Sequence, residues 1–199
     1  MSNGCGRTST EMARCFIPVQ PLSRDGFAPY GDVIDAGGPE SFPTNGGAAH
    51  RFHRLGVADC GAEGGAALLS IFRVLHAGLP PRVKMMERHP LSSQAFIPLA
   101  GQRFVVIVAP AQCRPDPEML RAFVTDGRQG VNYHRATWHH PLVALDGGDF
   151  LVVDRDGPGP DFNQDYEEVF LSRDVLIDMR AVEAALSTLS PTSSQEQNR

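Results

Sequence analysis

Lysine is almost missing from this chain of 199 residues, because Lys84 is the only lysine among its 18 basic residues. All the other basic residues are arginine, and 23 acidic residues bring the formal net charge to −5. Binding to a phosphate backbone requires a clustered positive field. The charge balance therefore excludes nucleic acid as the expected partner.

Cysteine is also scarce, and long apolar runs are missing. The four cysteines are widely separated, without a CxxC pair: Cys5, Cys15, Cys60 and Cys113. This scatter favours reduced thiols in the cytosol over a disulfide framework or a zinc knuckle. The longest apolar stretch, residues 104–110, is too short to span a membrane, and residues 1–10 lack the apolar core of a signal peptide. We expect a cytoplasmic protein with no membrane partner.

Turn-forming residues, in contrast, are abundant. The 20 glycines and 16 prolines make up about 18% of the chain, against roughly 12% in average proteins, and this argues against a helical bundle. The length fits one domain. We expect a flexible N-terminus over residues 1–11, a single β-barrel domain over 12–186 and a disordered polar tail over 187–199.

Short apolar or alternating segments, separated by turn signals, predict β-strands through most of this domain. Both faces of the segment 104–109 are apolar, which is typical of a strand buried on both sides. Glycine-rich loops are expected at 36–47 and 61–65. The pattern predicts a mainly β fold, an antiparallel β-barrel or jelly roll with a few short helices. The expected strands are 14–19, 31–34, 68–75, 82–89, 94–99, 102–109, 130–134, 141–145, 149–154 and 167–171.

Three helical segments are expected between these strands. One turn is predicted at 23–28, and a closing helix at 174–186. The third has the clearest signals, because Asp116 can cap it, Pro117 would be its first residue and Gly127 would end it. Its apolar stripe would consist of Met119, Leu120, Phe123 and Val124.

Four of the seven histidines fall in two short stretches, residues 85–101 and 130–141. Side chains alternate along a strand, so Glu87 and His89 share a face, and Lys84 faces the other side if the strand is regular. The adjacent residues His139 and His140 diverge, so at most one of them can join Glu87 and His89. Two imidazoles and a carboxylate that converge in a barrel can hold a divalent metal or carry out acid–base chemistry.

Structural roles compete with these functional interpretations. A strand histidine is more often a core or rim residue than a ligand, and Trp138 is typical of a core or interface anchor. Arg73 alternates with apolar neighbours and either lines a pocket or faces solvent; we favour the pocket. The cationic segment 51–54 fits a solvated face equally well.

The first histidine stretch resembles the first cupin motif. Glu87 stands at its first histidine position, His89 at the second, Gln94 at the glutamate and Gly101 at the closing glycine. The second stretch is similar to the second cupin motif, with His134 for proline, Ala136 for glycine and His139 as the motif histidine.

Longer segments resemble one family more specifically, the ureidoglycolate lyases, also called ureidoglycolate hydrolases. The most telling segments are 87–91, 94–99, 130–135 and 138–142, and the likeness extends to 27–34, 45–47, 51–53 and 149–155, so that it covers residues 14–171. It implies a cupin-like barrel, single or bicupin-like, that forms a homodimer in purine catabolism. The implied reaction splits ureidoglycolate into glyoxylate and urea. The chain departs from the family at Ser92, usually glycine, at Ala136, usually glycine or asparagine, and at Arg54, usually acidic.

The resemblance and the substrate's chemistry suggest roles for individual residues. His89 and His139 would lie at the centre of the pocket, with Glu87 as base or as the group that orients an imidazole, and Gln94 on the ureido group. The remaining substrate-binding candidates are Arg73 or Lys84 for the carboxylate, together with Tyr133 and His134.

The resemblance implies a divalent metal ion such as nickel, held by Glu87, His89 and His139, and no organic cofactor. The alternative is that Gln94, in place of the usual cupin glutamate, marks a site that has lost its metal. Two other functions remain open at this point. A metal-dependent cupin oxygenase would consume oxygen, and a non-catalytic cupin would bind a small acid without turnover.

Overall fold

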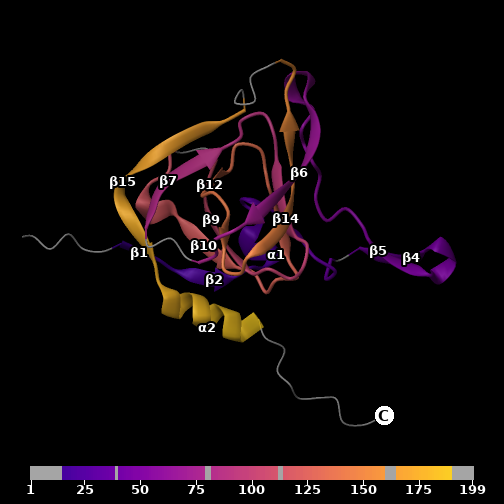
Figure 1. Ribbon diagram of the computed structural model, residues 1–199, viewed down its shortest axis with the longest axis horizontal. Helices are drawn as coiled ribbons and strands as arrows, with labels where there is room; N and C mark the ends of the chain where they lie inside the picture. Colours follow the sequence, from indigo (N-terminus) through magenta and orange to yellow (C-terminus); the bar gives the residue numbers. More distant parts are fainter. Residues whose placement is uncertain (1–14, 39, 79–81, 112–113, 160–164, 190–199) are drawn as a thin grey trace, which may run out of the picture.

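Two β-sheets face each other across an apolar interior in the computed structural model (Figure 1), which describes residues 15–38, 40–78, 82–111, 114–159 and 165–189. Together they form a nearly closed, mainly β barrel, as the strand pattern predicted, and the barrel is cupin-like, as the resemblance implied. Strands are paired antiparallel except β1 with β15 and β10 with β2, which are parallel.

The first sheet has eight strands in the described chain. Their order is β1 (Cys15–Ile17), β15 (Glu167–Ile177), β7 (Val83–Arg88), β12 (Trp138–His139), β9 (Phe104–Ala109), β10 (Arg121–Val124) and β2 (Val19–Pro21), with β13 (Val143–Ala144) also paired to β9. The second sheet follows the order β3 (Gly31–Ile34), β11 (Gly130–Tyr133), β8 (Gln94–Pro98), β14 (Gly148–Asp156) and β6 (Ala66–Val74). Strand β6 is therefore an edge strand of the second sheet.

A two-stranded sheet lies apart from these two. It consists of β4 (Ser41–Thr44) and β5 (Ala49–Phe52), joined by the 3-10 turn η1 (Asn45–Gly47). The other helical elements are α1 (Arg24–Phe27), η2 (Ala62–Gly64), η3 (Pro117–Met119) and α2 (Met179–Leu189). None of the helices in the described residues is long and apolar enough to cross a membrane.

The barrel has an apolar core on each side of the first sheet. Inside the barrel, Phe104, Val106 and Val108 of β9 pack with Phe96 and Phe150 from the second sheet. On the outer side, β9 contributes alternate residues to a second core that helix α2 covers. Both faces of β9 are buried, as its apolar pattern predicted.

The prediction of a helix after Asp116 is wrong. Asp116 does cap a turn, its carboxylate accepting a hydrogen bond from the Glu118 amide at 3.0 Å, but that turn is the single 3-10 turn η3. The following residues form strand β10, because Phe123 packs inside the barrel while Ala122 and Val124 pack in the outer core. Alternating burial between two sheets outweighs the local helix signals.

Other boundaries also differ from expectation. Pro18 divides the strand expected over 14–19 into β1 and β2, and the loop expected over 36–47 contains β4. Residues 174–177 belong to β15, so the closing helix begins later, at Met179, and continues to Leu189, inside the expected tail. The expected flexible residues 1–11 and the remainder of that tail lie outside the described residues.

Candidate active site

Neighbouring strands of the first sheet bring Glu87 and His139 together. The two residues are direct partners across β7 and β12, and His139 is paired on its other side with Val108, which faces the barrel interior. His139 Nε2 lies 3.6 Å from Glu87 Oε1, and the imidazole is 1% exposed. The strand parity that placed Glu87 inside the barrel therefore also selects His139, rather than His140, as its partner.

The two site histidines are oriented by main-chain carbonyls. His89 Nδ1–H donates to the Asp165 carbonyl at 2.6 Å, and His139 Nδ1–H donates to the Thr137 carbonyl at 2.9 Å. In the neutral His89 ring this leaves Nε2 unprotonated. Nε2 of His89 is buried without a hydrogen-bond partner. The donor atoms of His89, His139 and Glu87 all lie within 4.8 Å of one another.

This donor set fits a divalent metal ion. Ligating histidines characteristically donate their other ring N–H to a carbonyl or carboxylate, which is the arrangement of both rings here. Two imidazoles with one carboxylate are borderline-to-hard donors suited to first-row divalent metals such as nickel. The buried, unpaired Nε2 of His89 is the atom that such an ion would satisfy.

Tyr133 and Gln94 enclose His139 from the second sheet. The Tyr133 ring stacks on the His139 imidazole with centroids 4.2 Å apart and an angle of 11°. Burial, followed by the charge of Glu87, raises the pKa of Tyr133, so that its hydroxyl stays protonated. Gln94 is paired with Tyr133 across β8 and β11, and its Oε1 lies 3.1 Å from His139 Nε2.

The Glu87 carboxyl is ionised in this setting. Burial alone would raise its pKa, but the neighbouring imidazoles of His139, His89 and His140 outweigh burial and hold the pKa below its ordinary value. Burial lowers the pKa of His140, which favours its neutral form. His140 Nδ1–H donates to the Pro141 carbonyl at 2.8 Å.

Two further side chains of this cluster were missed by the sequence analysis. Asp154 of β14 interacts with Gln94 and His89, and burial raises the pKa of its carboxyl. Tyr166 packs its ring 6.3 Å from that of His89, and its hydroxyl donates to Glu168 at 2.9 Å. Burial and the hydrogen bond to Glu168 raise the pKa of Tyr166 to about 12. Strand alternation along 149–154 could have placed Asp154 on the inner face of the barrel. Tyr166 precedes a strand, so no alternation pattern assigns a face to it.

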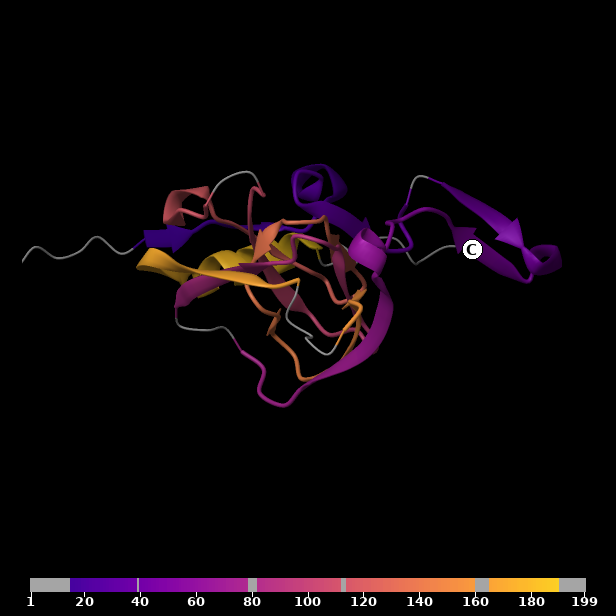
Figure 2. The same ribbon diagram turned by 90° about the horizontal axis from the view of Figure 1, so that it is seen from above.

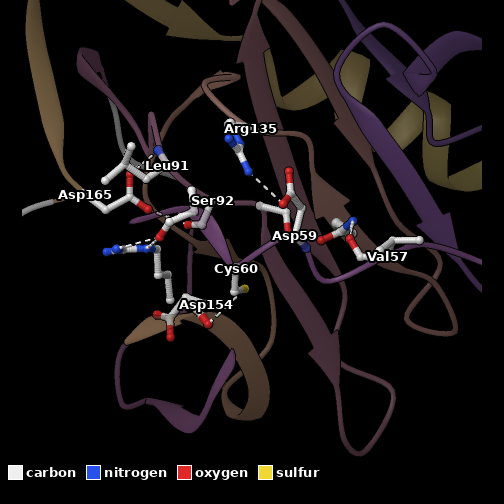
Figure 3. A network of polar contacts seen from close by, with 12 residues as sticks. Val57, Asp59, Cys60, Leu91, Ser92, Arg135, Asp154 and Asp165 are labelled. Carbon is white, nitrogen blue, oxygen red and sulfur yellow. Dashed lines mark hydrogen bonds and ion pairs between the residues drawn. The ribbon is translucent and has the colours of Figure 1, made fainter. Parts of the chain in front are cut away.

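Asp165 fixes the turn that carries His89. Its carboxylate accepts hydrogen bonds from the Leu91 amide at 2.5 Å and from the Ser92 hydroxyl at 2.6 Å (Figure 3). The Asp165 side chain is almost completely buried, and Ser92 is 1% exposed. Beside this clasp, the free cysteine Cys60 donates its thiol to the Asp154 carbonyl at 3.2 Å (Figure 3).

Three of the expected substrate-binding residues lie away from this cluster. Arg73 is on the solvent face, not in the pocket we favoured, because Phe72 takes the inner face of β6; Arg73 is bidentate to Asp149 at 2.7 and 2.8 Å. His134 pairs with Asp32 at 3.0 Å and lines a separate hollow of about 430 Å³. Lys84 is exposed on β7.

Among the departures from the family pattern, Ala136 has a structural consequence. Its φ is +62°, in the left-handed region that glycine and asparagine adopt most easily. The strained turn is still formed, because the Ala136 amide donates to the His89 carbonyl at 2.9 Å. The turn before His139 therefore also contacts the backbone of His89.

Comparison with known proteins identifies the family. The family model for ureidoglycolate lyase matches residues 14–178. The chain belongs to the ureidoglycolate lyase family. It is 47% identical over 153 residues to the ureidoglycolate lyase of Pseudomonas syringae pv. tomato, which covers 76% of this chain and 90% of that protein.

Two other relatives agree. The ureidoglycolate lyases of Pseudomonas aeruginosa strain LESB58 and of Pseudomonas fluorescens are each 48% identical over 144 residues, or 72% of this chain, and 85% and 86% of their own lengths. The resemblance drawn from the histidine stretches is confirmed. Members of the ureidoglycolate lyase family are named for a lyase activity on a small molecule.

Proposed function

We propose that the protein cleaves ureidoglycolate into glyoxylate and urea. The observation that carries the proposal is the convergence of Glu87, His89 and His139, with both imidazole Nε2 atoms directed away from their carbonyl partners. The substrate is a carbinolamine that also carries a carboxylate. Its cleavage needs a base for the hydroxyl proton and an acid for the departing nitrogen.

In the proposed reaction, the hydroxyl proton of the substrate moves to a carboxylate oxygen of Glu87. The carbon–nitrogen bond breaks as the carbonyl of glyoxylate forms, and its electron pair passes to the nitrogen, which takes up a proton to give urea. Gln94 hydrogen-bonds the ureido group. Asp154 interacts with Gln94, and its raised pKa suits a carboxyl that supplies this proton.

The proposal includes a divalent metal ion such as nickel, with Glu87, His89 and His139 as its ligands, and no organic cofactor. When bound, the ion supplies Lewis-acid polarisation of a substrate oxygen. The chain's own contribution is to present both Nε2 atoms, through the carbonyls of Thr137 and Asp165. Glu87 has two carboxylate oxygens, so one can be a ligand while the other receives the proton.

The proposal also includes a cytoplasmic homodimer. Edge strand β6 supports the dimer, because its large apolar side chains are exposed on both of its faces: Leu69 and Ile71 on one, Leu68 and Phe72 on the other. Apolar surface of this extent is typical of a protein interface. The free thiol of Cys60 fits a reducing compartment.

The decisive experiment supplies racemic ureidoglycolate to the purified protein and follows the release of glyoxylate, with and without a chelator. We expect release well above the spontaneous rate, and its loss in His89→Ala and His139→Ala. Turnover that survives both substitutions would overturn the site, and glyoxylate release at the spontaneous rate only would overturn the function. An oxygen electrode separates the lyase from a cupin oxygenase, since the lyase reaction consumes no oxygen. Binding without turnover would indicate a non-catalytic cupin.

A further inference from the structure

The hairpin β4–η1–β5, residues 41–52, projects from the barrel as an arm (Figures 1 and 2). Its strands pair with each other, and it makes no extensive contact with any other described element. An isolated two-stranded hairpin is marginally stable in water. The four paired residues of each strand reach roughly 13 Å at about 3.3 Å per residue, so the arm can extend onto another molecule.

The arm carries one charge. Arg51 is the only Asp, Glu, Lys or Arg in residues 41–52. Its side chain is exposed, and within the described residues it takes part in no hydrogen bond or ion pair. Phe42 lies directly opposite it on the same face, 43% exposed. This face therefore presents a guanidinium with no partner among the described residues, beside the Phe42 ring, whose centroid lies 5.7 Å from that of His53.

The candidate active site is rich in acidic groups and has no unpaired guanidinium within the described residues. Its side chains include the carboxylate of Glu87 and the carboxyl group of Asp154, with Glu168 paired to Glu87 across β15 and β7. The arginines of the surrounding segments are already engaged within the described chain: Arg88 with Glu167, Arg135 with Asp59, and Arg155 with the Ala62 carbonyl. A substrate carboxylate would meet acidic groups there without a guanidinium to bind it.

The walls beside the site are apolar and exposed. Leu68 is directly paired with Asp154, and it is 38% exposed on the inner face of β6. Phe72 lies on the same face of β6 and is 44% exposed. Phe170, two residues after Glu168 on β15, is 66% exposed. These inner faces belong to a barrel interior, where full burial is expected, so a further element is needed to cover them.

We propose that the arm of a second copy of this chain covers this opening and that its Arg51 binds the substrate carboxylate in the first copy's site. The arm supplies what the site lacks, a free guanidinium, and its Phe42 supplies apolar surface for the walls formed by β6 and β15. A guanidinium binds a carboxylate in a bidentate manner, which also orients the substrate. Two-fold symmetry exchanges the arms reciprocally, so that each copy completes the site of the other. The role of Arg51 rests on the proposed function.

The test is complementation between two impaired copies, assayed at a substrate concentration well below the wild-type KM, where the rate follows kcat/KM. Arg51→Ala is expected to lower kcat/KM about 10- to 100-fold, mainly through KM, because a charge-assisted bond to the substrate is lost. His139→Ala is expected to abolish turnover. The two variants are co-expressed with different tags, and the hybrid dimer is purified through both tags.

In the hybrid, the His139→Ala copy provides an intact arm to the intact triad of its partner. One site of two is complete, so the hybrid is expected to turn over at about half the wild-type rate. A hybrid no more active than its parents would overturn the proposal, as would an Arg51→Ala protein with wild-type KM. Arg51→Lys is the matched control, because it keeps the charge and is expected to recover part of the loss.

The arm has a second readout that does not depend on turnover. Replacement of residues 41–52 by a short Gly-Ser linker is expected to weaken the dimer, measured by sedimentation velocity, while circular dichroism of the barrel is retained. A dimer of unchanged stability would overturn the exchange of arms. A wild-type protein that dimerises through its arms but releases no glyoxylate would instead overturn the proposed activity and leave the exchange intact.

Discussion

Asp165 holds His89 directly through its backbone carbonyl and indirectly through its side chain, which bonds the turn after His89. The Asp165 carbonyl accepts the Nδ1–H of His89 at 2.6 Å, and the Asp165 carboxylate accepts the amide of Leu91, two residues after His89. One residue thereby sets both the tautomer of the imidazole and the position of the turn that carries it. A substitution of the Asp165 side chain changes the hydrogen bond to Leu91 and keeps the main-chain carbonyl that accepts from His89.

Asp165→Asn is expected to destabilise the protein and to weaken the site. The amide replaces one carboxylate oxygen by a donor, so the Leu91 amide or the Ser92 hydroxyl loses its acceptor in a buried setting. A loss of about 1–3 kcal/mol is expected in the free energy of unfolding, measured by urea denaturation. The displaced His89 is expected to lower metal affinity or kcat about 10- to 100-fold.

Ser92→Ala is the matched control for this substitution. It removes one of the two donors and leaves the carboxylate bonded to the Leu91 amide, so we expect a smaller loss, about 0.5–1.5 kcal/mol, and activity near wild type. If Asp165→Asn lowers stability but leaves both metal affinity and kcat unchanged, Asp165 supports the fold without positioning His89.

Asp154→Asn is expected to raise the free energy of unfolding at neutral pH and to lower the activity. Burial raises the pKa of Asp154 above the ordinary value of 3.8, so the unfolded chain loses this proton at a lower pH than the folded protein does. The free energy of unfolding therefore falls as the pH rises from 3.8 through the folded pKa, and Asn removes this cost. The variant is expected to be more stable than wild type at pH 7, with a difference that disappears toward pH 3.8.

Urea denaturation between pH 4 and pH 8 measures this difference in stability, and glyoxylate release measures the accompanying loss of activity. We expect kcat to fall in Asp154→Asn, because amide nitrogen cannot supply the proton to the departing nitrogen. A variant that is less stable than wild type at pH 7 would contradict the assigned effect of burial. Unchanged kcat would remove Asp154 from the reaction.

Strand alternation explains why part of this site could be predicted from the sequence. Alternation along a strand predicts that Glu87 and His89 share a face and that only one of His139 and His140 can join them. The motif resemblance names His139, and the structure pairs His139 with Glu87. The same argument needs a regular strand. The pairing of β7 with β15 shifts register between Phe170 and Val175. Counting along a regular strand therefore does not tell which face Lys84 takes relative to Glu87.

Other parts of the molecule depend on contacts that no local pattern contains. Asp165 lies before a strand, where neither alternation nor helical spacing assigns a face, and its partners are more than 70 residues away. Residues 121–124 carry local helix signals, yet pairing with β9 and β2 decides their structure. The arm appeared as a glycine-rich loop because Gly46 and Gly47 form the tip of a hairpin, both with positive φ.

Ala136→Gly is expected to stabilise the protein. The left-handed φ of +62° costs an alanine about 1–2 kcal/mol, and glycine gives back part of this gain through its greater freedom in the unfolded chain. The net gain is expected to be about 0.5–1 kcal/mol by urea denaturation, with activity retained. Ala136→Val is the opposite control and is expected to destabilise, because a β-branched side chain is poorly accommodated at this φ. A gain from valine, or a loss from glycine, would contradict the strain.

Metal binding by the triad can be measured without any substrate. Titration of the metal-free protein with Ni²⁺ is expected to give one site per chain, accompanied by proton release that grows as the pH falls, because ligating imidazoles must be neutral. His139→Ala removes one of three ligands and is expected to weaken binding at least about 100-fold. His134→Ala is the matched control: this histidine pairs with Asp32 in the separate hollow, and its loss is expected to leave the affinity unchanged. Equal weakening by both substitutions would place the ion outside the triad, and saturation at wild-type affinity in His139→Ala would exclude His139 as a ligand.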